Sequence, residues 1–136
     1  MTQTICLALP LLPDTADADR DEMLACWRGE RAAAHRASRA RHGITREATW
    51  IQPSPGGDLA IVLLESDDLA ASLYGLATST DPFDVWFRAH VERVHGVDLA
   101  AGMHLPEQIL DYPACAPFAQ LPHWIFGGDP VPRSRQ

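Results

Sequence analysis

A histidine on the apolar face of a predicted helix is the clearest candidate for chemistry in this sequence. Asp81 can cap the N-terminus of that helix, Pro82 suits its first position, and Gly96 suits its end. At 100° per residue, His90 shares one face with apolar residues at positions 83, 86, 87, 91 and 94. Imidazole titrates near neutrality, so His90 is a candidate catalytic base or a hydrogen-bonding group for a ligand. The alternative is a core histidine with both ring nitrogens hydrogen-bonded.

A second group comes from a predicted long helix over residues 17–42. Its inner face contains Met23, Cys26, Trp27, Glu30, Ala33, Ala34, Ala37 and Arg41. A buried carboxylate is costly unless it is paired, so Glu30 is expected to pair with Arg41, another arginine or His90. We therefore take His90, Glu30 and Arg41 as the candidate catalytic residues. The alternative is a helical phase error that leaves Glu30 at the edge of this face.

Large rings suggest a pocket for a flat ligand. The candidate substrate-binding residues are Trp27, Trp50, Phe83 and Trp86. Their alternative role is to fill the core as its largest members. Glu47 and Trp50 alternate along one predicted strand, so only one of the two can face the helices.

Several other classes of function lack support in the sequence. The chain has a net charge of −7 and no lysine, which argues against a nucleic-acid partner. No H-x-x-x-H, G-x-G-x-x-G, P-loop or G-x-S-x-G motif is present, so no metal, cofactor or nucleotide site is expected. Three cysteines without a C-x-x-C pair favour a reducing compartment. No segment approaches the ~20 apolar residues of a membrane span, so we expect a soluble cytoplasmic protein without a membrane partner.

The predicted elements follow a recognisable order along the chain. The pattern predicts strands at residues 4–9, 46–52 and 58–65, and helices at 17–42, 67–77 (capped by Ser66) and 82–95. The Gly/Pro loop between the second and third strands favours a hairpin. Residues 106–112 could add an edge strand or lie across a partner subunit.

This order is that of a ferredoxin-like βαββαβ fold, an α+β class in which helices cover one face of a single sheet. The third strand is apolar on both faces, so it should be central and covered on each side. Dimerisation through the bare face of the sheet would achieve this. We predict a domain over residues 1–98 and a Pro/aromatic-rich C-terminal arm over 99–136, packed on the domain or on the partner subunit.

Three motifs carry a resemblance to known proteins. They are G-I-T-R-E-A-T-W-I-Q-P-S-P-G-G-D (43–58), D-P-F-D-V-W-F-R (81–88) and H-G-V-D (95–98). In its order of elements the chain resembles the dimeric α+β-barrel superfamily, and on these three motifs it resembles more closely a group of small uncharacterised actinobacterial proteins. The superfamily includes cofactor-independent monooxygenases and polyketide cyclases. Members that degrade haem rely on an asparagine, which this chain lacks.

These observations predict a small homodimeric enzyme of secondary metabolism that binds no cofactor. It would be monooxygenase- or cyclase-like, with a flat aromatic or polyketide-like small molecule as its ligand. The alternative is a non-catalytic dimer that binds a metabolite or a protein partner.

Overall fold

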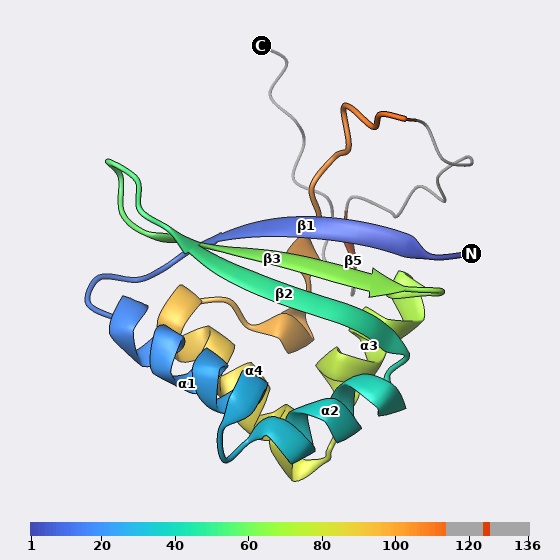
Figure 1. Ribbon diagram of the computed structural model, residues 1–136, viewed down its shortest axis with the longest axis horizontal. Coiled ribbons are helices and arrows are strands. Elements are labelled where there is room, and N and C mark those ends of the chain that lie inside the picture. Colours follow the sequence, from blue (N-terminus) through green and yellow to red (C-terminus); the bar gives the residue numbers. More distant parts are fainter. Residues whose placement is uncertain (114–123, 126–136) are drawn as a thin grey trace.

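One antiparallel sheet with helices on a single face forms the body of the protein. The computed structural model describes residues 1–113 and 124–125. Figure 1 shows helices α1 to α4 together on one side of strands β1, β2 and β3. In chain order the elements are β1 (Gln3–Pro10), α1 (Ala16–Arg28), α2 (Ala32–Arg41), β2 (Ile44–Gln52), β3 (Leu59–Ser66), α3 (Leu69–Thr78), α4 (Pro82–His95), the 3₁₀ helix η1 (Leu99–Ala101), β4 (Met103–His104) and β5 (Trp124–Ile125). The predicted α+β class is confirmed.

The order of the sheet is β1-β3-β2, and β3 is antiparallel to both of its neighbours. β2 and β3 form the predicted hairpin, and β3 is central as expected. β1 and β2 therefore run parallel on either side of β3, connected by α1 and α2. This arrangement is compatible with a ferredoxin-like fold.

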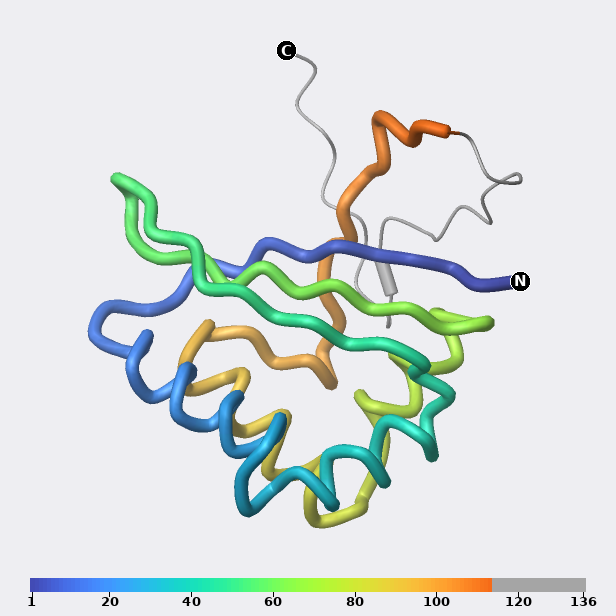
Figure 2. Tube along the Cα trace, viewed as in Figure 1, coloured from blue at the N-terminus to red at the C-terminus, as the bar shows by residue number. Residues whose placement is uncertain are grey.

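The predicted long helix is wrong, because the chain breaks into two helices at residues 29–31. Gly29 has an extended backbone, and the N–H groups of Gly29 and Arg31 both donate to the carbonyl of Ala25. A Cβ at Gly29 would lie 2.8 Å from the Ala25 Cα, so only glycine fits this turn. Figure 2 shows the change of direction between α1 and α2. The break resets which residues of the second helix face the sheet.

The ends of α3 and α4 follow from local hydrogen bonding. In α4, the Asp81 carboxylate accepts from the Phe83 N–H at 3.0 Å, and Gly96 ends the helix at φ +70°. Both features of this helix were predicted. In α3 the cap is Asp68, whose side chain accepts from the Ala71 N–H, and not Ser66 as predicted.

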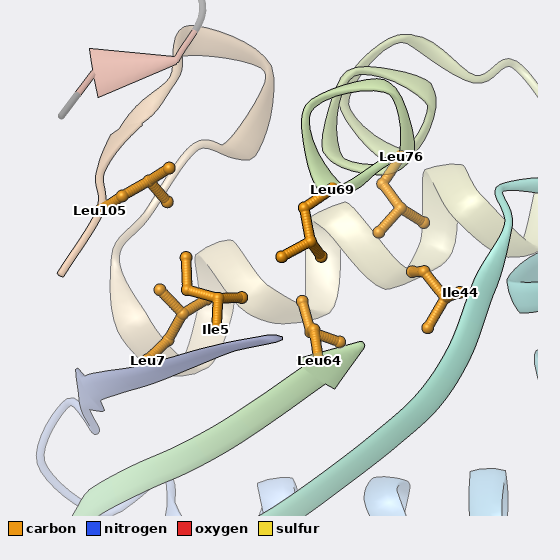
Figure 3. Packing of buried hydrophobic residues seen from close by; sticks show 7 residues of the cluster. All are labelled: Ile5, Leu7, Ile44, Leu64, Leu69, Leu76 and Leu105. Atoms are coloured by element: carbon orange, nitrogen blue, oxygen red, sulfur yellow. The ribbon is translucent and has the colours of Figure 1, made fainter. Parts of the chain in front are cut away.

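The hydrophobic core lies between the sheet and the helices. Figure 3 shows its central cluster, formed by Ile5, Leu7, Ile44, Leu64, Leu69, Leu76 and Leu105. Leu105 lies beyond residue 98, so the core extends past the predicted domain boundary. Residues 106–112 form no strand, so the edge strand, one of the two options for this segment, is wrong, and its position across a partner subunit stays a prediction. Of the predicted arm, residues 114–123 and 126–136 lie outside the described part of the chain.

The opposite face of the sheet carries no described helix (Figure 1). Strand register assigns Cys6, Ala8, Ala48, Trp50, Ile61 and Leu63 to this outer face. Cys6 and Ala8 are exposed, and Trp50 is 53% exposed. This outer face is thus apolar and accessible. No helix among the described residues is long and apolar enough to cross a membrane.

Gly75 in the middle of α3 leaves room for a histidine. A Cβ at this position would lie 2.5 Å from the His42 Nδ1, and His42 is held by a 2.8 Å hydrogen bond to Asp84. We expect Gly75→Ala to lower the free energy of unfolding by about 1–3 kcal/mol through overpacking, despite the better helix propensity of alanine. Urea denaturation measures the change.

The matched control is Gly56→Ala in the β2–β3 loop, where an added Cβ meets no atom within 4 Å. That substitution should leave stability within about 0.5 kcal/mol. Equal stability of the Gly75→Ala protein and the wild type would show that His42 can move without loss.

Candidate functional site

A cavity lies between the inner face of the sheet and the helices. Its volume is about 80 Å³, counted as the space that the centres of water-sized molecules can occupy. A single water needs roughly 10–15 Å³ on this measure, so the cavity can hold several waters or part of a small ligand. The wall is mostly apolar, and its polar members are Asp19, Arg39, Glu47, Thr49, His90 and His95.

The first polar feature of the wall is a buried carboxylate–imidazole pair. His90 from α4 and Asp19 from α1 are 2% and 3% exposed, and Nε2 of His90 lies 2.8 Å from Oδ1 of Asp19. A carboxylate oxygen can only accept a hydrogen bond, so this contact assigns a proton to Nε2, and the lone pair of a neutral imidazole then lies on Nδ1. Within residues 1–113 no group is hydrogen-bonded to His90 Nδ1 or to Asp19 Oδ2. The pair therefore has unused hydrogen-bonding capacity beside the cavity.

Stacked rings hold the His90 imidazole from one side. The centre of the Trp86 ring lies 5.5 Å from that of the imidazole at an interplanar angle of 15°, and the guanidinium carbon of Arg31 lies 3.8 Å from the centre of the Trp86 ring. Arg31 is itself bonded to Glu22 at 2.8 Å. The hydrogen bond to Asp19 and the stack on Trp86 together fix both the position and the plane of the imidazole.

The second polar feature surrounds Glu47, which points inward from β2. His35 Nε2 lies 2.7 Å from Glu47 Oε1, and Arg39 Nε donates to Glu47 Oε2 at 2.9 Å. Burial acts to raise the pKa of Glu47, but the hydrogen bond from His35 and the charge of Arg39 outweigh it and lower the pKa. Glu47 is thus a carboxylate at neutral pH and neutralises the charge of Arg39.

A third cluster centres on Asp84 and ties three helices together away from the cavity. Its carboxylate, 1% exposed, is bonded to Ser38, Ser79, Arg41 and His42. Burial acts to raise the pKa of Asp84, but these hydrogen bonds, led by that of His42, hold it well below its usual range. Asp84 does not line the cavity, so its role is to join α2, the end of α3 and α4.

The structure brings only part of the predicted site to the cavity. Of the three candidate catalytic residues, His90 lines it, whereas Glu30 is exposed in the turn between α1 and α2. Arg41 is 41% exposed and pairs with Asp81 and Asp84. Neither of these two side chains is part of the cavity wall.

The predicted aromatic wall is also divided. Trp27 is 67% exposed with the Arg28 guanidinium over its ring, and Trp50 lies on the outer face of the sheet. Phe83 and Trp86 of α4 pack against each other with their ring centres 5.5 Å apart, and neither lines the cavity. The ring that does line the cavity is Phe87.

The sequence analysis did not include Asp19 and Arg39 among the candidate site residues. Asp19 is four residues before Met23, so one further turn on the predicted inner face would have included it. Arg39 is not on the predicted inner face because that face assumes one continuous helix through residues 29–31. For the strand, the sequence allows either Glu47 or Trp50 on the inner side.

Other kinds of site find little support in the described residues. No three His, Cys, Asp or Glu side chains within this part of the chain group closely enough to hold a metal ion. Burial raises the pKa of the Cys26 thiol to about 11, so this cysteine is a protonated core residue and a poor nucleophile.

No protein-family profile matches the chain, and no curated protein or solved structure is significantly similar to it. The function is therefore inferred from the geometry of the site.

Proposed function

We propose that this protein is a small cofactor-independent enzyme in which His90 transfers a proton to and from a flat aromatic or polyketide-like molecule. The observation that carries the proposal is the buried Asp19–His90 pair beside the cavity, with Nδ1 of His90 lacking a partner in residues 1–113. A carboxylate that fixes the tautomer of a histidine is a common arrangement for a general base. Cyclisation or oxygenation of an activated substrate both begin with such a proton transfer.

The cavity supports a mostly apolar ligand. Its wall combines aliphatic side chains of the sheet with Phe87 and Val91 of α4, and only a few polar groups interrupt it. Ligand sites of this kind use a small number of polar groups to fix orientation. Trp86 acts on the ligand only through His90, as a positioning residue.

A homodimer in the cytoplasm is part of the proposal. The outer face of the sheet exposes Trp50 and Cys6 among apolar neighbours, and a second copy of the chain would cover them. The same open face also favours the alternative function, a dimer that binds a metabolite or a protein without catalysis. The two functions differ in what the Asp19–His90 pair contributes.

The double variant Asp19→Leu/His90→Phe tests the proposal. Replacing two buried, mutually bonded polar side chains with well-packed apolar ones of similar volume is often neutral or stabilising by about 1–4 kcal/mol. We therefore expect a melting temperature at or above that of the wild type. In a thermal-shift screen, quinone-like and flavonoid-like compounds should raise the melting temperature of the wild type and leave that of the double variant unchanged.

Trp50→Phe on the outer face is the control, and we expect it to keep the ligand response of the wild type. A double variant that melts far below the wild type would show that the pair serves stability. An undiminished ligand response in the double variant would assign the binding to other residues.

A further inference from the structure

We propose that the ligand of this cavity is a neutral ketone whose carbonyl oxygen binds Arg39 while the proton on the adjacent carbon faces His90. The inference rests on the proposed function and names its substrate class. The observations behind it are the hydrogen bonds of Arg39, a buried arginine that is bonded to neither Asp19 nor His90.

Arg39 has more donors than the described residues use. A guanidinium carries five N–H groups. Nε donates to Glu47 Oε2 at 2.9 Å, Nη2 to Glu47 Oε1 at 3.3 Å, and Nη1 to Ser38 Oγ at 3.1 Å. Within residues 1–113, one N–H on each terminal nitrogen is left without an acceptor. The side chain is only 6% exposed, so water reaches these donors poorly, and a buried donor without an acceptor is unfavourable.

The position of Arg39 makes a ligand the natural acceptor. The side chain is part of the cavity wall, and its guanidinium carbon lies 4.4 Å from the centre of the Phe87 ring. Phe87 is three residues before His90 on α4, so the two side chains are neighbours on one helix face. Phe87 therefore lies beside the guanidinium of Arg39 and next to His90 on the helix face, and all three residues belong to the cavity wall.

The charges around the cavity select a neutral ligand. Glu47 neutralises Arg39 through two hydrogen bonds, and Asp19 adds a second carboxylate to the wall. No lysine exists in the chain, and among the described residues Arg39 is the only arginine that lines the cavity. A carboxylate or phosphate would lose its hydration in this apolar space, and it would find no cation whose charge is not already neutralised. A carbonyl oxygen needs only the N–H groups.

The resulting step is an enolisation. His90 Nδ1 takes the proton from the carbon next to the carbonyl, and the C–H electron pair forms the carbon–carbon double bond. The carbonyl π electrons move to the oxygen, where the Arg39 N–H groups stabilise the developing charge. Return of the proton from Nδ1 to carbon restores the ketone, so the step needs no oxidant or reductant.

Proton exchange of a simple ketone tests the inference without knowledge of the natural substrate. The probe is acetophenone in D₂O, with exchange of its methyl protons followed by proton NMR. We expect the wild type to accelerate this exchange by about 100-fold or more over buffer. We also expect acetophenone to bind more tightly than benzoate, its closest anionic counterpart, in titrations followed by NMR.

The informative variant is Arg39→Lys, which keeps the charge beside Glu47 but has only three N–H groups. Glu47 and Ser38 would occupy all three, so exchange should fall by about 100-fold. Arg36→Lys, an exposed position on the same helix, is the control and should exchange at the wild-type rate. If Arg39→Lys does not fold, the carbonyl ¹³C shift of acetophenone bound to the wild type gives a second test. A hydrogen bond to Arg39 moves it downfield of its value in water.

The outcomes separate the two proposals. Benzoate binding as tight as that of acetophenone, a wild-type exchange rate in folded Arg39→Lys, or an unmoved carbonyl shift would overturn the assignment of Arg39. The role of His90 would stand if its replacement still abolished exchange. Absence of any acceleration by the wild type, together with a destabilised Asp19→Leu/His90→Phe protein, would overturn the proposed function itself.

Discussion

Asp84→Ala is expected to lower the free energy of unfolding by about 3–5 kcal/mol, a large share of the stability of a small domain. The carboxylate is fully buried and is bonded to four side chains, three from α2 and the residue that ends it, and one from the residue that ends α3. Alanine would leave His42, Ser38 and Ser79 without their acceptor, inside the protein. Each buried polar group that loses its partner adds to the cost. Chemical denaturation at neutral pH measures the change.

The dependence of this loss on pH follows from the lowered pKa of Asp84. Because the pKa of the folded state lies below that of the unfolded chain, the stabilisation is complete above the unfolded value. It is lost as the pH falls through the folded value. We therefore expect the stability difference between wild type and Asp84→Ala to be constant near neutrality and to shrink below about pH 4.

Asp81→Ala is the matched control for Asp84→Ala, three residues away on the same helix end. Asp81 caps α4 and is partly exposed, so its loss should cost only about 1 kcal/mol. Similar losses for the two variants would mean that the buried network around Asp84 contributes no more than an ordinary helix cap.

The helix α4 shows how much the sequence can predict when the signals are local. Asp81, Pro82 and Gly96 define its ends through hydrogen bonds and backbone preferences within a few residues. The apolar periodicity between them correctly predicted that His90 is buried. Such features depend on no distant part of the chain, so the sequence predicts them without the tertiary structure.

The helices α1 and α2 show where this reasoning ends. The sequence around Gly29 has good helix formers on both sides, and a single glycine costs only about 1 kcal/mol inside a helix. The turn depends on how both halves pack against the sheet. Because the turn shifts the helical phase, Glu30 moves into solvent and Arg39 takes an inner position. The helix break at Gly29 therefore removes Glu30 as a partner for His90.

The sheet leaves a comparable ambiguity that only tertiary structure resolves. Alternation places Glu47 and Trp50 on opposite faces, but it does not say which face the helices cover. Hydrophobicity favours an inward tryptophan, whereas the structure turns Glu47 inward to Arg39 and His35. The inward side chain of β2 pairs with two residues of the preceding helix α2, and the alternation within the strand does not identify these partners.

Asp19→Asn should reduce the rate of acetophenone exchange by about 10²–10⁴-fold while leaving the fold and most of the ligand affinity in place. Asparagine has the shape of aspartate, but its amide can donate a hydrogen bond to His90 Nε2. That bond favours the tautomer with the proton on Nδ1, and His90 then has no lone pair for the ligand. The wild-type carboxylate imposes the opposite tautomer through its 2.8 Å contact with Nε2.

Nitrogen-15 NMR of the imidazole of His90 decides between the causes of such a loss, because the protonated and unprotonated ring nitrogens have well-separated shifts. We expect Nε2–H in the wild type and Nδ1–H in Asp19→Asn, with the exchange rate falling in step. Asp17→Asn, an exposed carboxylate on the same helix that pairs with Arg20, should alter neither the tautomer nor the rate. If His90 carries its proton on Nδ1 in the Asp19→Asn protein and acetophenone still exchanges at the wild-type rate, the base is not His90. The buried pair would then hold α1 against α4 without taking part in chemistry.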